Sequence, residues 1–516
     1  MPRTGIATGT GNPEYLPRPT GLVPHSLSEL ADRFRARLDG ADVTVSGVTA
    51  ASALVQTGDL FAGVPGQHAH GARYAAEAMA AGAAAILTDE AGAALVPSGT
   101  STLVVPDVRA TLGPLAAVVY GEPSAAMNVI GITGTSGKTT TGFLVRAGLQ
   151  AAGRPAGLIG TLGTFMGDDL VKTGFTTPEA PELQALLAAL REYGVADVVM
   201  EVSSHALAMH RVDGIDFRVT AFTNLSQDHL DFHRDMDDYF AAKSRLFGAD
   251  FGAATDAVVV IDDEWGARLA RTLSDPITVA TAEGARASWV ARDIVERADG
   301  GSTFRVLGPG VDLVTGCALP GRFNVANALL ALALLERVGV PPDAAVAHAV
   351  ASAPVPGRME RVDAGQPFLA VVDYTHKPAA VDAALRALRA RTAGRLIVVL
   401  GSGGDRDRAK RPLMGEVAAR AADVLVVTDD NPRSEDPAEI RAAVLAGALA
   451  VPAATRAEIR EVADRAEAIA TAVSLAAPGD TVLVAGKGHE PGQEVAGVVH
   501  PFDDREILRA ALRAAL

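Results

Sequence analysis

The stretch Ile130-Gly-Ile-Thr-Gly-Thr-Ser-Gly-Lys-Thr-Thr140 joins an apolar, strand-like segment to a helix-like one through a glycine-rich turn. Backbone N–H groups of such a loop cradle phosphate oxygens, and the helix N-terminus that follows favours negative charge. Lys138 would neutralise the β- and γ-phosphates of a nucleotide, and the Thr139 hydroxyl would bind Mg²⁺. The stretch fits the variant G-T-x-G-K-T-T, because Ile132 stands where the strict pattern has its first glycine. We predict a nucleotide-binding strand–loop–helix unit here, the alternative being a tight turn without function.

Two polar segments further along the chain supply candidate Mg²⁺ ligands. Val198-Val-Met-Glu-Val-Ser-Ser-His205 is typical of a buried strand ending in polar groups, and Glu201 could hold Mg²⁺ directly or through water. Thr223-Asn-Leu-Ser-Gln-Asp-His-Leu-Asp-Phe-His233 places two aspartates and two histidines within six residues. Such a cluster could bind a transition metal, but with no cysteine nearby we favour an oxygen-rich Mg²⁺ site with His229 as a ligand or orienting group. A solvated strand end and a helix N-cap cluster are the structural alternatives.

Lysine is rare in this chain. Six of the 46 basic residues are lysine and the other 40 are arginine. Arginine cannot replace lysine where a compact point charge or a neutral, nucleophilic amine is needed. The lysines that remain are therefore candidates for a specific role; they are Lys138, Lys172, Lys243, Lys377, Lys410 and Lys487.

Composition excludes several classes of protein. The 516 residues hold one cysteine, Cys317, which excludes an intramolecular disulfide framework and cysteine-based zinc or iron–sulfur sites. The net charge of −15 argues against binding to nucleic acid or an anionic membrane by bulk electrostatics. No stretch reaches the roughly 18 apolar residues of a membrane-spanning helix. Residues 1–20 lack the apolar core of a signal peptide, so we expect a disordered leader on a cytoplasmic protein.

Glycine and proline punctuation divides the chain into blocks at residues 21–124, 125–354 and 355–516. Apolar runs typical of strands, such as residues 128–133, 197–202, 396–400 and 481–485, alternate with alanine-rich stretches typical of helices. This alternation predicts an α/β protein with mostly parallel sheets.

Taken together, the motifs G-T-S-G-K-T-T, E-V-S-S-H, N-L-S-Q-D-H-L-D-F-H and Ala242-Lys243 resemble the central domain of the Mur ligases. These are ATP-dependent, amide-forming enzymes of peptidoglycan precursor synthesis, related to folylpolyglutamate synthetases. The resemblance covers about residues 45–505. It implies an N-terminal α/β domain that binds a nucleotide sugar (21–124), a central P-loop ATPase-like parallel sheet (125–354) and a C-terminal Rossmann-like domain that binds the added amino acid (355–516).

The resemblance also implies an ATP site. Leu319-Pro-Gly-Arg-Phe-Asn-Val-Ala-Asn327 resembles the adenine-side segment, whereas Arg358 would hold a phosphate, Asp373 the ribose, and His376 with Lys377 the phosphate end. The implied ATP-binding residues are Gly134, Thr135, Ser136, Gly137, Lys138, Thr139, Thr140, Asn324, Asn327, Arg358, Asp373 and His376.

The same resemblance implies a metal and catalytic set. Thr139, Glu201 and His229 would bind Mg²⁺, and Lys243 would react with CO₂ to give a carbamate that supports a Mg²⁺ ion. Lys138, Glu201, Lys243 and His229 are the implied catalytic residues. Only a neutral primary amine can form a carbamate, which agrees with a lysine being kept at this position. The alternative for Lys243 is a helix lysine that extends its head to solvent.

In the third block, Asp430-Asn-Pro-Arg433 matches the family motif that recognises diaminopimelate. An arginine can clamp the distal carboxylate of that amino acid through two hydrogen bonds, whereas lysine as substrate would leave the guanidinium without a partner. Arg406 matches a second arginine of this pocket, and Gly486 and Glu490 match positions that receive the amine end. Alone, the Asn-Pro pair would be an ordinary turn.

The muramyl-peptide substrate of the family lies between the first two domains. The matching positions are Ser52, Thr176, Thr177, Ser203 and Arg211. The chain departs from the family pattern at Ala51 and Ala53, where an Asp-Ser-Arg triplet is usual, and at Met209, where glutamine is usual.

The expected function is ATP-driven addition of diaminopimelate, as the meso isomer, to the D-Glu γ-carboxylate of UDP-N-acetylmuramoyl-L-Ala-D-Glu through an acyl phosphate. We expect a monomer that binds no nucleic acid and inserts into no membrane. One alternative is a Mur-type ligase with a different donor or added amine, such as LL-diaminopimelate. The other is a non-catalytic scaffold, against which the intact Lys138, Thr139, Glu201, Lys243 and Arg433 argue.

Overall fold

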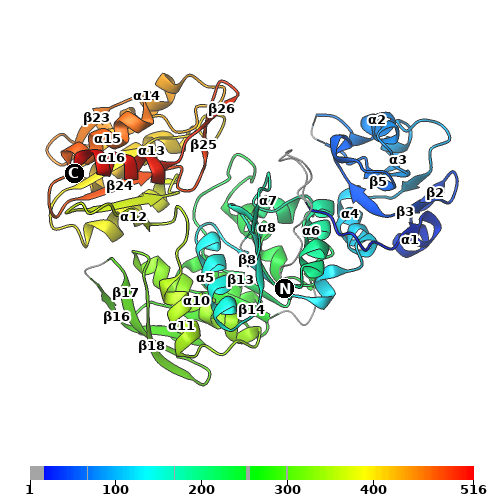
Figure 1. Ribbon diagram of the computed structural model, residues 1–516, viewed down its shortest axis with the longest axis horizontal. Coiled ribbons are helices and arrows are strands. Elements are labelled where there is room, and N and C mark those ends of the chain that lie inside the picture. Colours follow the sequence, from blue (N-terminus) through cyan, green and yellow to red (C-terminus); the bar gives the residue numbers. More distant parts are fainter. Residues whose placement is uncertain (1–16, 67, 168, 252–255, 298–299) are drawn as a thin grey trace.

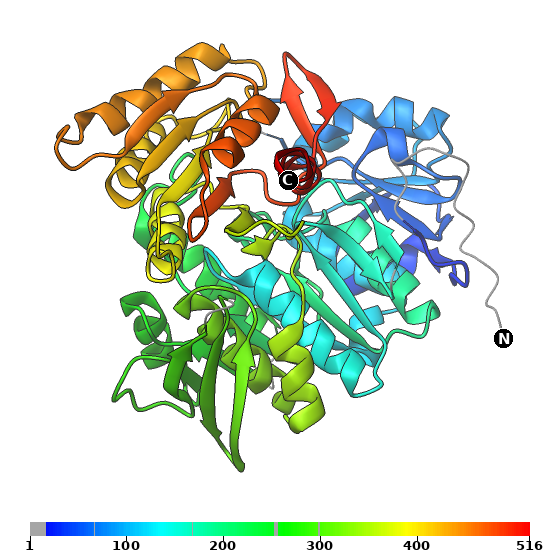
Figure 2. The ribbon, with the colours of Figure 1, turned by 60° about the vertical axis from the view of Figure 1, so that its left-hand side comes forward.

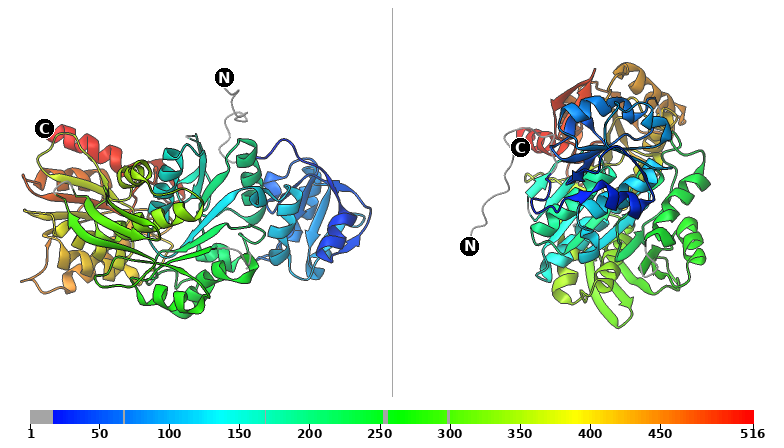
Figure 3. Two further views of the ribbon diagram at one scale, coloured as in Figure 1. Left: turned by 90° about the horizontal axis from the view of Figure 1, so that it is seen from below. Right: turned by 90° about the vertical axis from the view of Figure 1, so that its right-hand side faces the viewer.

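The computed structural model describes residues 17–66, 68–167, 169–251, 256–297 and 300–516. Most of the predicted leader at residues 1–20 therefore lies outside the described residues. Three large sheets follow one another along the described chain, beside two small two-stranded sheets. We call each large sheet with the elements around it the first, central and third unit. The central unit lies between the other two (Figures 1 and 3).

The first unit is built on a sheet of strand order β2-β7-β6-β5-β4, in which β4 to β7 run parallel and β2 is antiparallel to β7. Its strands are β1 (His25–Ser26), β2 (Arg37–Asp39), β3 (Thr44–Val45), β4 (Gly47–Thr49), β5 (Asp59–Ala62), β6 (Ala85–Thr88) and β7 (Thr102–Val104). Its helices are α1 (Leu27–Phe34), η1 (Ser52–Leu54), η2 (Gly71–Tyr74), α2 (Ala75–Ala80), α3 (Glu90–Ala93), α4 (Val108–Val119) and η3 (Pro123–Ala126). Helix α4 shares its apolar core with Ala180, Ala185 and Ala188 of the central unit, so the two units pack together.

The central sheet has the order β11-β10-β9-β12-β8-β13-β14-β15-β16-β17-β18. Its strands are β8 (Asn128–Thr133), β9 (Ala156–Gly160), β10 (Gly163–Met166), β11 (Asp169–Val171), β12 (Asp197–Glu201), β13 (Val219–Phe222), β14 (Asp256–Val260), β15 (Ile277–Ala280), β16 (Trp289–Glu296), β17 (Ser302–Gly308) and β18 (Val311–Cys317). Its helices are α5 (Lys138–Ala151), α6 (Ala180–Glu192), α7 (Ser204–Ala208), α8 (Met236–Ser244), η4 (Arg245–Phe247), η5 (Ala249–Phe251), α9 (Glu264–Thr272), α10 (Arg322–Arg337) and α11 (Ala344–Ser352).

Helices cover both faces of the parallel part of this sheet. Helices α5, α10 and α11 share one core with β8 and β14, whereas α6 packs on the other face against β9 and β12 (Figure 1). A parallel strand buried on both faces must be apolar throughout, which is why β8 and β12 stand out in the sequence as continuous hydrophobic runs.

The third unit has the strand order β19-β20-β24-β21-β22-β23, parallel from β20 onward. Its strands are β19 (Glu360–Arg361), β20 (Leu369–Asp373), β21 (Leu396–Leu400), β22 (Val424–Val427), β23 (Glu458–Glu461), β24 (Thr481–Ala485) and the separate hairpin β25 (Gly492–Val495) and β26 (Val498–Pro501). Its helices are α12 (Pro378–Arg389), α13 (Lys410–Ala421), α14 (Pro437–Ala450), α15 (Arg465–Leu475) and α16 (Asp504–Ala515). Two apolar cores, one on each face of the sheet, hold this unit together.

The α/β prediction is confirmed, because strands and helices alternate in all three units. The sequence did not reveal that the central sheet ends in the antiparallel ribbon β16–β17–β18. That ribbon is exposed along much of its length, so its strands lack the long apolar runs of β8 or β24. Among the described residues, no helix is long and apolar enough to cross a bilayer.

Candidate active site

The glycine-rich loop joins β8 to α5 and adopts a backbone that only glycine permits. Gly134 and Gly137 have φ angles of +139° and +89°. A Cβ on Gly134 would lie 1.9 Å from Thr223 Oγ1, and one on Gly137 would lie 2.5 Å from Asn327 Oδ1. The loop is therefore packed closely between the end of β13 and helix α10.

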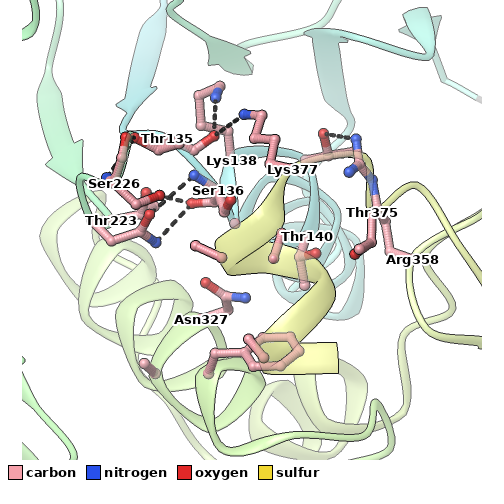
Figure 4. A pocket seen from close by; sticks show the side chains of 18 of the residues that line it. Thr135, Ser136, Lys138, Thr140, Thr223, Ser226, Asn327, Arg358, Thr375 and Lys377 are labelled. Carbon is pink, nitrogen blue, oxygen red and sulfur yellow. Dashed lines mark hydrogen bonds between the residues drawn. The ribbon is translucent and has the colours of Figure 1, made fainter. Parts of the chain in front are cut away.

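Residues at the end of β13 fix the loop from the opposite side. Asn224 Oδ1 accepts from the Ser136 N–H at 3.0 Å, and Asn224 Nδ2 donates to the Ser136 carbonyl at 2.9 Å. The Thr223 hydroxyl donates to the same carbonyl at 2.6 Å. Figure 4 shows Thr223 beside Ser136 at the rim of the pocket. Neither Thr223 nor Asn224 was predicted as a site residue, although both stand in the quoted motif directly after a parallel strand.

Two rare lysines share the Gly134 carbonyl oxygen. Lys138 Nζ and Lys243 Nζ each donate to it at 2.9 Å. Burial, reinforced by the neighbouring Lys377 charge, lowers the pKa of Lys138 to about 8. A nearby anion strongly stabilises the charged form of a lysine that is so poorly solvated. A phosphate-binding site needs such a lysine.

Lys243 is buried deeper than Lys138. It comes from α8, is 1% exposed, and its ammonium lies 4.7 Å from the ring centroid of Tyr239. Burial, together with the charge of Lys138, lowers the pKa of Lys243 well below that of an ordinary lysine. Its amine is therefore disposed to be neutral, which is the form that reacts with CO₂.

Glu201 lies at the end of β12 with its carboxylate turned toward the loop. It is 2% exposed and accepts from the Thr139 hydroxyl at 2.9 Å. The N–H and hydroxyl of Thr161, which follows β9, donate to it at 2.9 and 3.1 Å. A buried carboxylate beside a hydroxyl is a donor set that suits Mg²⁺. Thr161 was missed from the sequence, although it too follows a parallel strand.

His229 presents its ring to the same cavity from a left-handed backbone conformation with φ of +54°. Its Nε2 lies 3.0 Å from Asp228 Oδ2, and its ring makes an edge contact with His205. The described residues contain no group of three or more His, Cys, Asp or Glu side chains that could hold a metal.

The third unit packs against the central unit (Figure 2). It reaches the loop through Arg358 and Lys377 (Figure 4). Arg358 Nη2 donates to the Thr139 hydroxyl at 3.2 Å, and its guanidinium covers the Tyr374 ring. Lys377 forms an ion pair with Asp228. Burial alone would raise the pKa of Asp228, but Lys377 and His229 hold it far below its usual range. The two units thus meet through charged groups at the glycine-rich loop.

Asp373 and His376 line the cavity near this junction. The Asp373 carboxylate accepts from the N–H groups of Met359 and Thr375 at 2.7 and 2.9 Å, so it is already engaged with the backbone. Burial raises its pKa. His376 Nδ1 lies 2.7 Å from the Tyr374 carbonyl oxygen, and burial lowers its pKa to about 3, so the ring is neutral.

On the central unit, α10 supplies the predicted adenine-side residues. Asn327 Nδ2 donates to Asn324 Oδ1 at 2.9 Å, and Asn324 Nδ2 donates to the Pro320 carbonyl at 2.7 Å. Both asparagines line the cavity (Figure 4 labels Asn327).

These groups enclose a cavity of about 640 Å³, a volume in the range of small-molecule sites. Of the predicted residues, it is lined by Thr135, Ser136, Gly137, Lys138, Thr139, Thr140, Thr176, Glu201, Ser203, His229, Asn324, Asn327, Arg358, Asp373 and His376. Lys243 is not among the described lining residues; it lies behind the loop, against Gly134.

The predicted donor-site residues surround the end of β12. Thr177 Oγ1 donates to the Glu201 carbonyl at 2.8 Å and accepts from the Ser203 N–H at 3.2 Å. Arg211 pairs with Glu179 at 2.7 Å, and its guanidinium also reaches Met209 Sδ at 3.7 Å. The predicted Ser52 belongs to the first unit, where it begins η1 half-buried.

A second cluster forms where β22 and β24 end in the third unit. Arg433 takes a left-handed conformation with φ of +53°; its Nη1 donates to the Gly404 carbonyl at 2.6 Å and its Nε lies 3.4 Å from Glu494 Oε2. Arg406 is exposed and contacts the Asp405 carbonyl at 3.4 Å. Glu494 was missed from the sequence because it lies on the hairpin β25–β26, outside any quoted motif. The predicted residues that meet here are Asp430, Asn431, Pro432, Arg433, Gly486 and Glu490.

Comparison with known proteins agrees with the geometry. Family models match in three segments: the Mur ligase family catalytic domain at residues 44–120, the Mur ligase middle domain at 132–335 and the Mur ligase glutamate ligase domain at 357–488.

Two similar proteins are both named UDP-N-acetylmuramoyl-L-alanyl-D-glutamate–2,6-diaminopimelate ligase. One, from Streptomyces coelicolor, is 52% identical over 96% of this chain and 98% of its own. The other, from Corynebacterium glutamicum, is 54% identical over 96% of this chain and 97% of its own. A solved structure with the same name is 32% identical, with a TM-score of 0.65, over 91% of this chain and 95% of its own.

Proposed function

The chain belongs to the Mur ligase family, and on that premise we propose that it adds 2,6-diaminopimelate to UDP-N-acetylmuramoyl-L-alanyl-D-glutamate. It is an ATP-dependent amide ligase of peptidoglycan precursor synthesis. The observation that carries the substrate assignment is identity above 50% over almost the whole chain with ligases named for this reaction.

The chemistry requires activation of a carboxylate, which is a poor acyl donor because its leaving group would be oxide. The γ-carboxylate oxygen of the D-Glu residue attacks the γ-phosphorus of ATP, and ADP leaves. The diaminopimelate amine then attacks the acyl carbon, phosphate departs, and the amine loses a proton. Catalysis of such a transfer is mainly positioning and neutralisation of charge.

Lys138 and Arg358 carry the neutralisation in this proposal. They come from opposite units, and a phosphate would give Lys138 an anionic hydrogen-bond partner in place of the backbone carbonyls that it contacts now. Asn324 and Asn327 would bind the adenine side, while Asp373 and His376 would contact ribose and phosphate.

Thr139, Glu201 and His229 fit Mg²⁺, since a buried carboxylate, a hydroxyl and an imidazole face one cavity. The ion would supply positive charge that stabilises the transferring phosphoryl group. We assign Lys243 as a carbamate, formed when its neutral amine attacks CO₂ and loses a proton. Its burial and lowered pKa support that reaction.

Arg433 would bind the distal carboxylate of diaminopimelate. In the structure its Nε lies 3.4 Å from the Glu494 carboxylate, so one N–H group of the guanidinium already faces an acidic side chain of the protein. Glu490 and Gly486 would receive the distal amine, and Asp430 to Pro432 shape the same pocket. Arg406 is assigned here by family resemblance, and its exposure leaves it free to turn toward a ligand.

Ser52, Thr176, Thr177, Ser203 and Arg211 would bind the muramyl dipeptide between the first and central units. Met209 gives Arg211 a sulfur neighbour where the family pattern has an amide, and Ala51 and Ala53 remove polar groups near Ser52. These departures favour the second candidate function, a Mur-type ligase with an altered donor or added amine.

We place the reaction in the cytoplasm, where ATP is available, and propose that a monomer carries it out. We also propose a division into domains at residues 21–124, 125–354 and 355–516, centred on the nucleotide sugar, ATP and the amino acid respectively, with the donor and ATP sites each completed by a neighbouring unit.

The direct test is product formation. Incubation with ATP, Mg²⁺, UDP-N-acetylmuramoyl-L-Ala-D-Glu and meso-diaminopimelate should yield a species equal in mass to both substrates less one water. Product from LL-diaminopimelate but not from the meso isomer would favour the second candidate. Absence of product with either isomer, despite ATP binding, would leave the scaffold alternative.

Arg433→Lys should raise the KM for diaminopimelate by about 10- to 100-fold, because one charged hydrogen-bond pair of about 1.5–3 kcal/mol is lost. The KM for ATP should stay unchanged, since Arg433 lies outside the cavity at the glycine-rich loop. Initial-rate kinetics would measure both. Arg420→Lys, at an exposed pair with Glu416 on α13, is the matched control. An unchanged KM for diaminopimelate in Arg433→Lys would contradict the assignment.

A further inference from the structure

The parallel strands β22 and β24 lie on either side of β21, so their carboxyl ends meet at one edge of the third sheet. Asp430 and Asn431 follow the first strand, and Lys487 and Glu490 follow the second. The Lys487 side chain is 0% exposed, whereas Glu490 keeps 29% of its side chain exposed. A buried cation therefore lies directly beneath an acidic group that a ligand can reach.

Lys487, Asn431 and Glu490 form a closed triangle of hydrogen bonds. Lys487 Nζ donates to Asn431 Oδ1 at 2.9 Å and to Glu490 Oε2 at 3.2 Å. Asn431 Nδ2 donates to the same Glu490 oxygen at 2.7 Å. One ammonium thus fixes both the direction of the Asn431 amide and the position of the Glu490 carboxylate.

The charge balance of the cluster depends on Lys487. Asp430 Oδ1 lies 3.7 Å from the same Nζ, so two carboxylates surround one ammonium. The nearby cation Arg465 is bound to Asp504 in a fully buried pair and donates to the Ala485 carbonyl. It is therefore committed elsewhere. Arg465 acts on Asp430 and Glu490 only as a neighbouring charge, so without Lys487 both carboxylates would lose the one ammonium that pairs with each of them.

We propose that Lys487 is a positioning residue for the added amino acid, holding Glu490 and Asn431 where Glu490 can receive the distal ammonium of diaminopimelate. This inference rests on the proposed function. Lys487 acts through Glu490 and not by contact with the substrate, because its side chain is fully buried. Arg433, which follows β22, binds the distal carboxylate. The cluster therefore binds both the ammonium and the carboxylate at the distal end of diaminopimelate.

The surroundings of residue 487 also explain why it is a lysine in a chain whose basic residues are mostly arginine. The neighbouring Gly486 and Gly488 have φ angles of +122° and +56°. A Cβ on Gly486 would already lie 2.6 Å from Asp430 Oδ2. Lys487 is completely enclosed, and its compact ammonium with three donors suits the closely placed oxygens of Asn431 and Glu490.

The test compares Lys487→Met with the wild-type enzyme. The KM for diaminopimelate should rise about tenfold or more, as expected when a charged hydrogen-bond partner is removed, with the KM for ATP and for the muramyl dipeptide unchanged. Thr392→Val is the matched control: Thr392 bonds the Leu388 carbonyl and Thr481 Oγ1 at the opposite end of β24. It removes buried hydrogen bonds in the same unit and should leave every KM unchanged.

A double-mutant cycle separates positioning from a merely structural role. If Lys487 acts through Glu490, Lys487→Met/Glu490→Gln should have the same KM for diaminopimelate as Glu490→Gln alone. Should Lys487→Met fail to fold, Asn431→Ala serves instead, because it removes the hydrogen bonds of Asn431 to Lys487 and Glu490. It should likewise raise the KM for diaminopimelate. An unchanged KM in Lys487→Met, or effects of the two substitutions that multiply, would overturn the proposal. Absence of turnover in the wild-type enzyme would instead overturn the proposed function.

Discussion

Lys138→Met should lower kcat/KM by about 10³-fold or more, since it removes the cation aimed at the transferred phosphoryl group. In the structure Lys138 is held by the carbonyl oxygens of Gly134 and Thr135 and has a pKa lowered to about 8 by burial. An ammonium in that position contributes most when phosphate replaces the carbonyl contacts. Initial rates of phosphate release with ATP varied and the other two substrates saturating would measure the loss.

Lys172→Met is the control for this experiment, because Lys172 is an exposed lysine of the same unit. It should retain wild-type activity. Thermal unfolding of both variants would show whether the fold is intact. If Lys138→Met kept more than about a tenth of the activity, the role of the glycine-rich loop as phosphate site would be wrong.

Lys243→Arg should lower kcat by about 10²-fold or more, the second large effect we expect. Arginine keeps the positive charge but cannot form a carbamate, so it cannot present an anionic oxygen ligand. The buried amine beside Tyr239 also leaves little room for a guanidinium. Initial rates with saturating ATP and diaminopimelate would measure the change.

Dependence on CO₂ distinguishes the carbamate from a plain structural lysine. Wild-type enzyme prepared in CO₂-free buffer should lose activity and regain it when bicarbonate is added, whereas Lys243→Arg should not respond. Native mass spectrometry should show one added CO₂ in the active wild-type form. Full activity of the wild-type enzyme in CO₂-free buffer, without that mass increment, would contradict the carbamate at Lys243.

Much of the nucleotide site could be predicted because its residues follow continuous apolar strands. Strand β8 has the predicted bounds, and helix α5 follows the glycine-rich turn as predicted. Glu201 ends β12, which lies next to β8. Ligands gather at the carboxyl ends of parallel strands, so the sequence alone predicts that Glu201 belongs to the same site as the loop. The same rule, applied to every strand, would have found Thr161 and Thr223.

The family resemblance places Arg358 and Lys377 near the phosphates of ATP, but the direct contacts between units could not be predicted from the sequence. The approach of Arg358 to Thr139 and of Lys377 to Asp228 joins residues that lie far apart along the chain. Nothing in the local pattern of either segment encodes that pairing, because it depends on how two separately folded sheets pack. The burial of Lys487 is similar: its motif was visible, but the triangle with Asn431 exists only once β22 and β24 flank β21.

The most direct measurement of the central claim is phosphate release from ATP with Mg²⁺ and UDP-N-acetylmuramoyl-L-Ala-D-Glu, with meso-diaminopimelate, LL-diaminopimelate or L-lysine supplied in separate reactions. We predict turnover with meso-diaminopimelate and a kcat/KM about 10²-fold or more lower with L-lysine, which lacks the carboxylate that Arg433 binds. Equal turnover with lysine, or none with either diaminopimelate isomer while ATP still binds, would contradict the account.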